Sequence, residues 1–166
     1  MKWPSSAPSP IRVYLIDNQS MQRAAVRSWL ARHGRFEVVG SRGDLHEAIE
    51  DIRRRKPDLV LLDPVLPGMN EIAAMELLHR EFPELPIAIV THLADERSIR
   101  RAIQHGAGAY VSKDAEIGEL LTALESAHGG VPYVSPGLVR GSGSTRTQFA
   151  LPVYGDRSGV GSELRG

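Results

Sequence analysis

The chain has 166 residues, of which 42% are hydrophobic and 24% are charged, as is typical of one globular domain with short flanking segments. Its 20 basic residues balance its 20 acidic residues, which argues against a dominant role on nucleic acids or membrane surfaces. The lack of cysteine excludes a disulfide scaffold, a thiolate zinc site and a cysteine nucleophile. Only Lys2, Lys56 and Lys113 are lysines, so the position of each lysine is informative.

The first ten residues, MKWPSSAPSP, are rich in proline and contain no apolar run, so they are not expected to form a signal peptide. We expect residues 1–10 to be a disordered arm. No apolar run in the sequence approaches the roughly 20 residues that span a bilayer. A cytoplasmic protein without a membrane partner is therefore expected.

From residue 11 onward, short apolar segments alternate with amphipathic ones. The apolar runs predict strands at 11–16, 36–40, 59–62, 86–91 and 109–111. Helical spacing predicts helices at 21–33, 44–56, 70–82, 95–105 and 115–127. This alternation indicates an α/β fold with a doubly wound, five-stranded parallel sheet of flavodoxin-like order 2-1-3-4-5 and helices on both faces. In such a sheet, the functional crevice lies at the carboxyl ends of the strands, where strands 1 and 3 meet.

The composition changes after Pro136. Residues 137–166 are rich in glycine and include the run GSGSTRT, which predicts a flexible tail or linker. The apolar island at 148–154 is either a chance cluster or a docking motif. Residues 11–136 are thus expected to form the folded domain.

Polar residues stand at the carboxyl ends of four of the five predicted strands. They are Asp17-Asn18, Asp63, Thr91 and Ser112-Lys113. Singly, each has an ordinary explanation, such as a helix cap or a surface group. Together they would place two carboxylates, an amide, a hydroxyl and an ammonium at one rim. Oxygen ligands without histidine or cysteine suit Mg²⁺. A carboxylate beside such a cation can accept a phosphoryl group, whose oxygens the hydroxyl and the ammonium can bind.

Longer motifs surround these residues: IRVYLIDN at 11–18, DLVLLDPVLPGMN at 58–70, IAIVTHL at 87–93 and GAGAYVSKD at 106–114. With GGVPYVSP at 129–136, the sequence resembles a receiver domain of two-component response regulators, in the NarL/FixJ or LuxR-type branch. The resemblance covers roughly residues 11–136.

The resemblance implies a role for each rim residue. Asp63 is similar to the phosphoacceptor aspartate, Lys113 to the lysine that pairs with a phosphoryl oxygen, and Thr91 to the switch hydroxyl. Tyr110 is similar to the aromatic residue whose position follows that hydroxyl. The Mg²⁺ ligands that the resemblance implies are Asp17, Asn18, Asp63 and the backbone carbonyl of Val65. Pro67-Gly68 is similar to the turn that follows the acceptor.

The implied function is a signalling switch and not an enzyme. A sensor histidine kinase would transfer a phosphoryl group to Asp63, and the protein would then change an interaction surface, with a homodimer as one outcome. Control of transcription would follow if a longer chain exists. No DNA binding is expected from this segment, because residues after Pro136 lack the pattern of a helix-turn-helix domain.

Three departures from the family pattern keep an alternative open. Asn18 stands where a second aspartate is usual, which predicts weaker Mg²⁺ binding. Glu71 replaces a common glycine, and its simplest explanation is a favourable charge at the start of a helix. His92 replaces a small residue and either narrows the path to Asp63 or points outward. The alternative is a divergent receiver that acts as a phosphorylation-independent dimerisation or partner-binding module. A hydrolase using the same carboxylates is less favoured.

Overall fold

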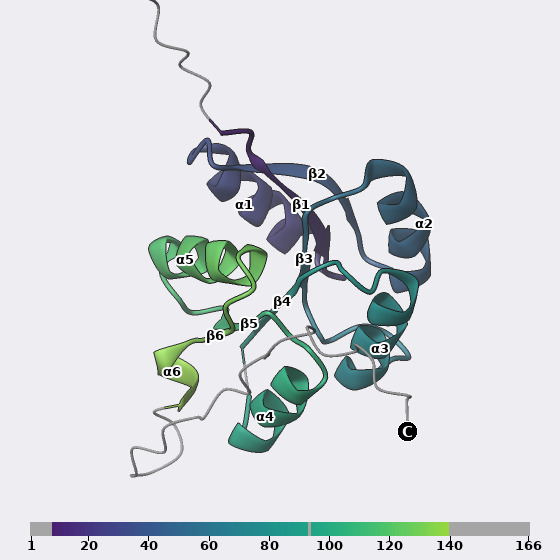
Figure 1. The fold of residues 1–166 in the computed structure, drawn as a ribbon, viewed down its shortest axis with the longest axis vertical. Coiled ribbons are helices and arrows are strands. Elements are labelled where there is room, and N and C mark those ends of the chain that lie inside the picture. The colour runs from purple at the N-terminus through teal and green to yellow at the C-terminus, as the bar shows by residue number, and fades with distance from the viewer. Residues whose placement is uncertain (1–7, 93, 140–166) are drawn as a thin grey trace, which may run out of the picture.

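The computed structural model describes residues 8–92 and 94–139, which fold around one parallel sheet (Figure 1). Neighbouring strands follow the order β2-β1-β3-β4-β5-β6, and every pair is parallel. The strands are β1 (Ile11–Ile16), β2 (Phe36–Arg42), β3 (Leu59–Leu62), β4 (Ile87–Thr91), β5 (Ala109–Ser112) and β6 (Tyr133–Val134). The predicted order of the first five strands is confirmed.

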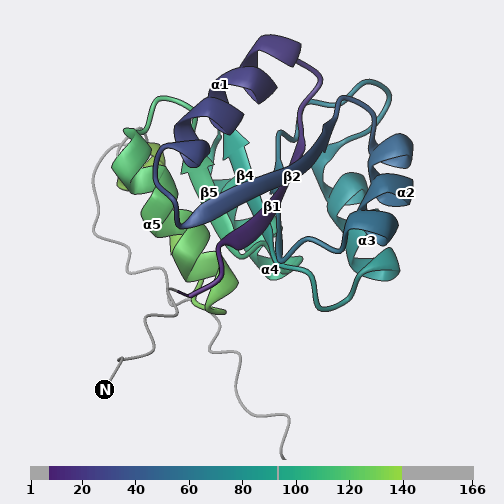
Figure 2. The same cartoon turned by 90° about the horizontal axis from the view of Figure 1, so that it is seen from above.

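Helices cover both faces of this sheet. They are α1 (Ser20–Ala31), α2 (Leu45–Arg55), α3 (Glu71–Glu81), α4 (Glu96–Gln104), α5 (Ile117–His128) and the short α6 (Pro136–Val139). Figure 2 shows α1 and α5 on one face, with α2 and α3 on the other. The apolar side chains form two cores accordingly. One core contains residues of α2, α3 and α4, and the other contains residues of α1 and α5.

The centre of the sheet explains why the apolar run at 59–62 was so continuous. All four residues of β3 are buried, and their side chains alternate between the two cores. Leu59 and Leu61 belong to the core beneath α1 and α5, whereas Val60 and Leu62 belong to the core on the other face. A strand covered on both faces needs apolar residues at every position.

Three helices begin at a side-chain cap. Asp44, Asn70 and Asp95 precede α2, α3 and α4, and their side chains accept hydrogen bonds from the backbone N–H groups of Glu47, Ala73 and Ser98. These bonds satisfy N–H groups that have no partner within the helix. The five predicted helices are therefore found, with ends that differ from the predicted ones by one or two residues.

The sheet extends beyond the five predicted strands. β6 has only two residues and pairs with β5, and α6 begins at Pro136, where the domain was expected to end. A two-residue strand is too short to show an alternating pattern, so its pairing cannot be read from the sequence. Most of the predicted arm and tail, including the island at 148–154, lies outside the described residues. None of the helices in the described part is long and apolar enough to cross a membrane.

A buried carboxylate ties α2 to the sheet. Asp51 accepts a hydrogen bond from the Tyr14 hydroxyl at 2.9 Å, one from Arg55 Nε at 2.9 Å and one from Arg54 at 3.0 Å. Arg42 lies 3.7 Å away. Burial opposes ionisation of Asp51, but the hydrogen bonds from Arg55 and Tyr14 outweigh it and lower the pKa of the carboxyl. Arg54 and Arg55, two consecutive arginines at the end of α2, are therefore used within the fold.

Candidate functional site

The register of the two central strands brings the two predicted carboxylates to one rim. Ile16 of β1 pairs with Leu62 of β3, so the next residue on each strand, Asp17 and Asp63, stands at the same edge of the sheet. The N–H of Asp63 donates to the carbonyl of Ile16 at 2.8 Å, and the N–H of Asp17 donates to the carbonyl of Arg42 at 3.1 Å. Sheet hydrogen bonding thus positions both residues just beyond the strands.

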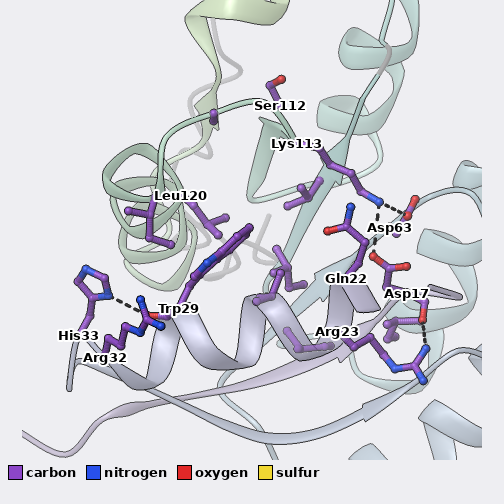
Figure 3. Close-up of a pocket in the computed structure, with 17 residues that line it drawn as sticks. Asp17, Gln22, Arg23, Trp29, Arg32, His33, Asp63, Ser112, Lys113 and Leu120 are labelled. Carbon is purple, nitrogen blue, oxygen red and sulfur yellow. Dashed lines mark hydrogen bonds and ion pairs between the residues drawn. The ribbon is translucent and has the colours of Figure 1, made fainter. Parts of the chain in front are cut away.

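Lys113 joins the two carboxylates (Figure 3). Its Nζ lies 2.5 Å from Asp63 Oδ2 and 3.4 Å from Asp17 Oδ2. The side chains of Lys113 and Asp63 are only 8% and 5% exposed, so this ion pair is nearly removed from water. The N–H of Lys113 donates to the carbonyl of Thr91 at 2.8 Å, which extends the pairing of Thr91 with Ser112. The guanidinium of Arg23 is also near, and it donates a hydrogen bond to the backbone carbonyl of Asp17 at 2.6 Å.

The second oxygen of each carboxylate is held by the backbone. Asp63 Oδ1 accepts a hydrogen bond from the N–H of Val65 at 2.9 Å, and Asp17 Oδ1 accepts one from the N–H of Gln19 at 2.7 Å. Each carboxylate therefore has one oxygen fixed by its own loop and one oxygen that faces the ammonium. This arrangement leaves little rotational freedom at Asp63.

The loop after Asp63 turns back sharply. Leu66 and Met69 form an isolated bridge across the turn, and Gly68 has φ +72° between them. A residue with a Cβ adopts this left-handed conformation only at a cost, so the glycine suits the turn. The turn that was expected at Pro67-Gly68 is therefore present. Val65 stands at its exposed side, with 67% of the residue accessible.

Two more of the predicted residues are buried like Asp63. Thr91 ends β4 and is 5% exposed, and Tyr110 in β5 is 1% exposed. The ring of Tyr110 belongs to the core beneath α4, and its hydroxyl donates a hydrogen bond to Glu71 Oε2 at 3.1 Å. Glu71 is thus a partner of Tyr110 that the sequence did not reveal.

Glu71 is the first residue of α3, as expected, but its side chain turns inward and is half-buried. Burial raises the pKa of Glu71, and the hydrogen bond from Tyr110 and the charge of Arg101 offset this only in part. A signal was present in the sequence: Glu71 shares its helix face with Ala74, Met75 and Leu78, which are all buried.

The other two departures from the family pattern lie at the surface. The side chain of His92 is 56% exposed, and its Nδ1 lies 3.7 Å from Asp114 Oδ1. The structure thus agrees with the outward orientation and not with an imidazole that narrows the path to Asp63. Asn18 is exposed directly after Asp17.

A cavity of about 400 Å³ opens between α1 and α5 and reaches the rim. Its walls are mainly apolar and include Val26, Trp29 and Leu120, while Asp63 and Lys113 line its inner end. Figure 3 shows Trp29 of α1 directed toward α5. The cavity therefore extends from the apolar surface between α1 and α5 to the side chains of Asp63 and Lys113.

Comparison with known proteins identifies the class to which this fold and rim belong. The family model described as response regulator receiver domain matches residues 13–125, and the chain belongs to this family. Response regulator GacA of Pseudomonas viridiflava is 31% identical over 126 residues, which cover 76% of this chain and 59% of GacA. The chain thus spans about three fifths of the length of this curated relative.

Solved structures agree with the predicted branch. A LuxR-family two-component response regulator from Aurantimonas sp. SI85-9A1 is 29% identical, with a TM-score of 0.74 over 79% of this chain and 94% of that one. The receiver domain of the putative response regulator NarL from Mycobacterium tuberculosis is 26% identical, with a TM-score of 0.68 over 74% and 99%. The chain is a receiver domain of two-component signalling, and its neighbours are LuxR- and NarL-type regulators.

The residues at the rim fit the Mg²⁺ ion that the family implies. Asp17 and Asp63 are two adjacent carboxylates, and Asn18 and the Val65 carbonyl add two neutral oxygens from flanking positions. These are hard oxygen donors of the kind Mg²⁺ prefers. Among the described residues, no group of three or more histidine, cysteine, aspartate or glutamate side chains is gathered as a metal site. Asn18 stands where a second aspartate is usual, so the proposed metal ligands include two carboxylates, those of Asp17 and Asp63.

Proposed function

We propose that this chain is a phosphorylation-operated switch in which Asp63 accepts a phosphoryl group from a sensor histidine kinase. One observation carries the proposal: Asp63 is buried, with Oδ1 held by the Val65 N–H and Oδ2 directed at the ammonium of Lys113. An oriented carboxylate beside a cation is suited to nucleophilic attack on a phosphoryl group.

In the proposed step, a carboxylate oxygen of Asp63 attacks the phosphorus of a phosphohistidine. The new bond joins that oxygen to phosphorus, the bond between phosphorus and the imidazole nitrogen breaks, and the nitrogen keeps the electron pair. Lys113 pairs with a phosphoryl oxygen, and the hydroxyl of Thr91 binds another. Both groups stabilise charge where the transferred group lies.

Asp17, Asn18, Asp63 and the carbonyl of Val65 are the residues proposed to hold Mg²⁺. When bound, this ion offsets the negative charge of the phosphoryl oxygens. Asn18 supplies one neutral oxygen where an aspartate would supply a charge, so Mg²⁺ binding is proposed to be weakened.

The proposed output is a change in the surface of α4, β5 and α5. Thr91 and Tyr110 lie at the end of β4 and within β5, so a movement of the Thr91 hydroxyl toward the phosphoryl group acts next to the core beneath α4. The partner of this surface is proposed to be a second copy of the chain. In a longer chain it would control transcription, as the names of relatives such as Transcriptional regulatory protein MctR suggest. We place this activity in the cytoplasm and assign no direct DNA contact to this segment.

A second candidate is a module that dimerises or binds a partner without phosphorylation. It is favoured by the buried hydrogen bond between Glu71 and Tyr110, which holds the aromatic residue in place without a phosphoryl group. The oligomeric state of the parent chain, with and without a phosphodonor, distinguishes the two candidates. The first candidate predicts that the phosphodonor changes it, and the second predicts that it does not. Asp63→Ala is the reference, because both candidates predict that this variant does not respond.

The direct test of the proposal uses acetyl phosphate and Mg²⁺ with detection by intact mass spectrometry. The parent chain should gain one phosphoryl group, and Asp63→Asn should gain none. Asp114→Asn is a matched control, because Asp114 lies at the same rim with its side chain 81% exposed, and this variant should be labelled like the parent. Equal labelling of Asp63→Asn, or an unlabelled parent chain, would refute the proposal.

A further inference from the structure

The hydroxyl of Tyr110 is a polar group inside an apolar core. Tyr110 is among the largest fully buried side chains and shares its core with Ile99, Ala102 and Ile103 of α4. A buried hydroxyl without a hydrogen-bond partner is unfavourable. Glu71 Oε2, at 3.1 Å, accepts the hydrogen bond that this hydroxyl donates. The buried position of Tyr110 is thus matched to an acceptor on a different element, α3.

The inward orientation of Glu71 has a cost that the start of a helix does not explain. Its other oxygen, Oε1, is buried and is the one buried side-chain polar atom in the described part of the chain without a hydrogen-bond partner. A carboxylate turned to solvent would interact with the helix dipole equally well. The inward orientation allows Glu71 to accept the hydrogen bond from Tyr110, and this bond offsets the cost.

We propose that Glu71 is a positioning residue that holds the side chain of Tyr110 in its buried position. It thereby fixes the packing of Tyr110 against α4 before Asp63 is modified. The role of Tyr110 in switching rests on the proposed function, whereas the hold of Glu71 on Tyr110 rests on geometry alone. The expected consequence is a receiver whose α4 surface responds less to the state of Asp63 than it would without Glu71.

Two charged residues of α4 and its N-cap act on the pKa of Glu71 with opposite signs. The charge of Arg101 lowers this pKa, and the charge of Asp95 raises it. Burial and the charge of Glu71 both raise the pKa of Tyr110, so its hydroxyl remains a donor at all ordinary pH values. Removal of the acceptor would leave that donor unpaired in the core. By the usual cost of such a group, the buried position should lose roughly tenfold or more in population relative to an outward one.

The test follows the ring signals of Tyr110 by NMR in a chain with ¹³C-labelled tyrosine, with and without beryllofluoride and Mg²⁺. The sequence has four tyrosines, and the Tyr110→Phe variant identifies the signal by its loss. In the parent chain, the Tyr110 signal should be that of a buried ring and should change little when beryllofluoride binds. In Glu71→Ala, it should move toward an exposed ring and regain a large response to beryllofluoride.

Two further variants keep the result interpretable. Glu71→Asp retains the charge that favours a helix start but is one methylene too short, so it should behave like Glu71→Ala even if the alanine variant folds poorly. Glu71→Gln retains an oxygen acceptor and should behave like the parent. Glu76→Ala is the control on the same helix, because the side chain of Glu76 is 62% exposed.

The proposal is overturned if Glu71→Asp and Glu71→Ala give the parent signal for Tyr110 both with and without beryllofluoride. Failure of the proposed function has a different signature. In that case, the backbone amide signals near Asp63 and Lys113 do not respond to beryllofluoride in any variant, while the beryllofluoride-free comparison of Tyr110 signals still tests Glu71.

Discussion

Replacement of Lys113 by methionine should destabilise the fold more than the same replacement of an exposed lysine. Lys113 is the cation that separates two carboxylates, with Nζ 2.5 Å from Asp63 and 3.4 Å from Asp17. Methionine keeps most of the volume of the side chain and removes its charge. Asp63 and Asp17 would then face each other with little water between them, since their side chains are 5% and 14% exposed.

The magnitude follows from the geometry. Both Oδ2 atoms contact one nitrogen, so they are at most about 6 Å apart, and their repulsion at an effective dielectric near 20 is at least about 3 kcal/mol. Loss of one partner from a buried ion pair usually costs 3–5 kcal/mol. We expect the free energy of unfolding of Lys113→Met to fall by about 3 kcal/mol in the absence of Mg²⁺.

Urea denaturation of a double-mutant cycle measures this effect. In the parent background, Asp63→Asn removes a partner of the ammonium and should be neutral or destabilising. In the Lys113→Met background, the same change removes repulsion and should restore much of the lost stability. Mg²⁺ should also stabilise Lys113→Met more than the parent chain, because it supplies positive charge to the same carboxylates. Lys56→Met serves as control, because Lys56 is an exposed lysine.

A Lys113→Met variant within about 0.5 kcal/mol of the parent, with an additive cycle, would refute this reasoning. It would mean that Lys113 and the carboxylates do not share a buried ion pair in solution. The measurement needs no phosphodonor, so it tests the geometry of the rim separately from its chemistry.

Three further predictions concern other parts of the chain. Asp51→Asn should lower the free energy of unfolding by about 3 kcal/mol at pH 7, because it leaves Arg55 and its neighbours without a buried counter-charge. The pKa of Asp51 is lowered in the folded state, so its contribution to the free energy of unfolding is present above its unfolded pKa of about 3.9 and is lost as the pH falls through the lower folded value. Urea titrations should therefore show a smaller difference between parent and variant at pH 3 than at pH 7. Lys56→Gly should raise the melting temperature, because Lys56 has φ 48° at the end of α2 and glycine relieves about 0.5–1 kcal/mol there; a lower melting temperature would contradict this. Asn18→Asp should tighten Mg²⁺ binding about tenfold by isothermal titration calorimetry, and unchanged affinity would remove Asn18 from the proposed metal ligands.

Much of the fold was predictable because the apolar patterns were strong. The run at 59–62 needed burial on both faces, and capping residues such as Asp44 and Asn70 marked where helices begin. Strand β6 was missed because two residues carry no periodicity, and its place depends on pairing with β5. Pairing between segments distant in sequence is a tertiary effect that local patterns do not encode.

Some residues of the candidate site were likewise predictable from the sequence, and others were not. The rule that parallel strands end at one rim was enough to bring Asp17, Asp63 and Lys113 together, because it depends on topology alone. The face that Glu71 shares with Ala74, Met75 and Leu78 hinted at its inward orientation, but its hydrogen-bond partner could not be read from the sequence. Its direction is decided by the hydroxyl of Tyr110, which stands 39 positions away in the chain.

The central claim is that Asp63 is the phosphoacceptor, and the most direct measurement locates the modified residue. The chain is incubated with acetyl phosphate and Mg²⁺, reduced with borohydride to convert an aspartyl phosphate to homoserine, and mapped by peptide mass spectrometry. We predict homoserine at position 63, dependent on Mg²⁺ and absent from Asp63→Asn. Homoserine at another position, or none at 63 under conditions that modify a known receiver in parallel, would contradict the account.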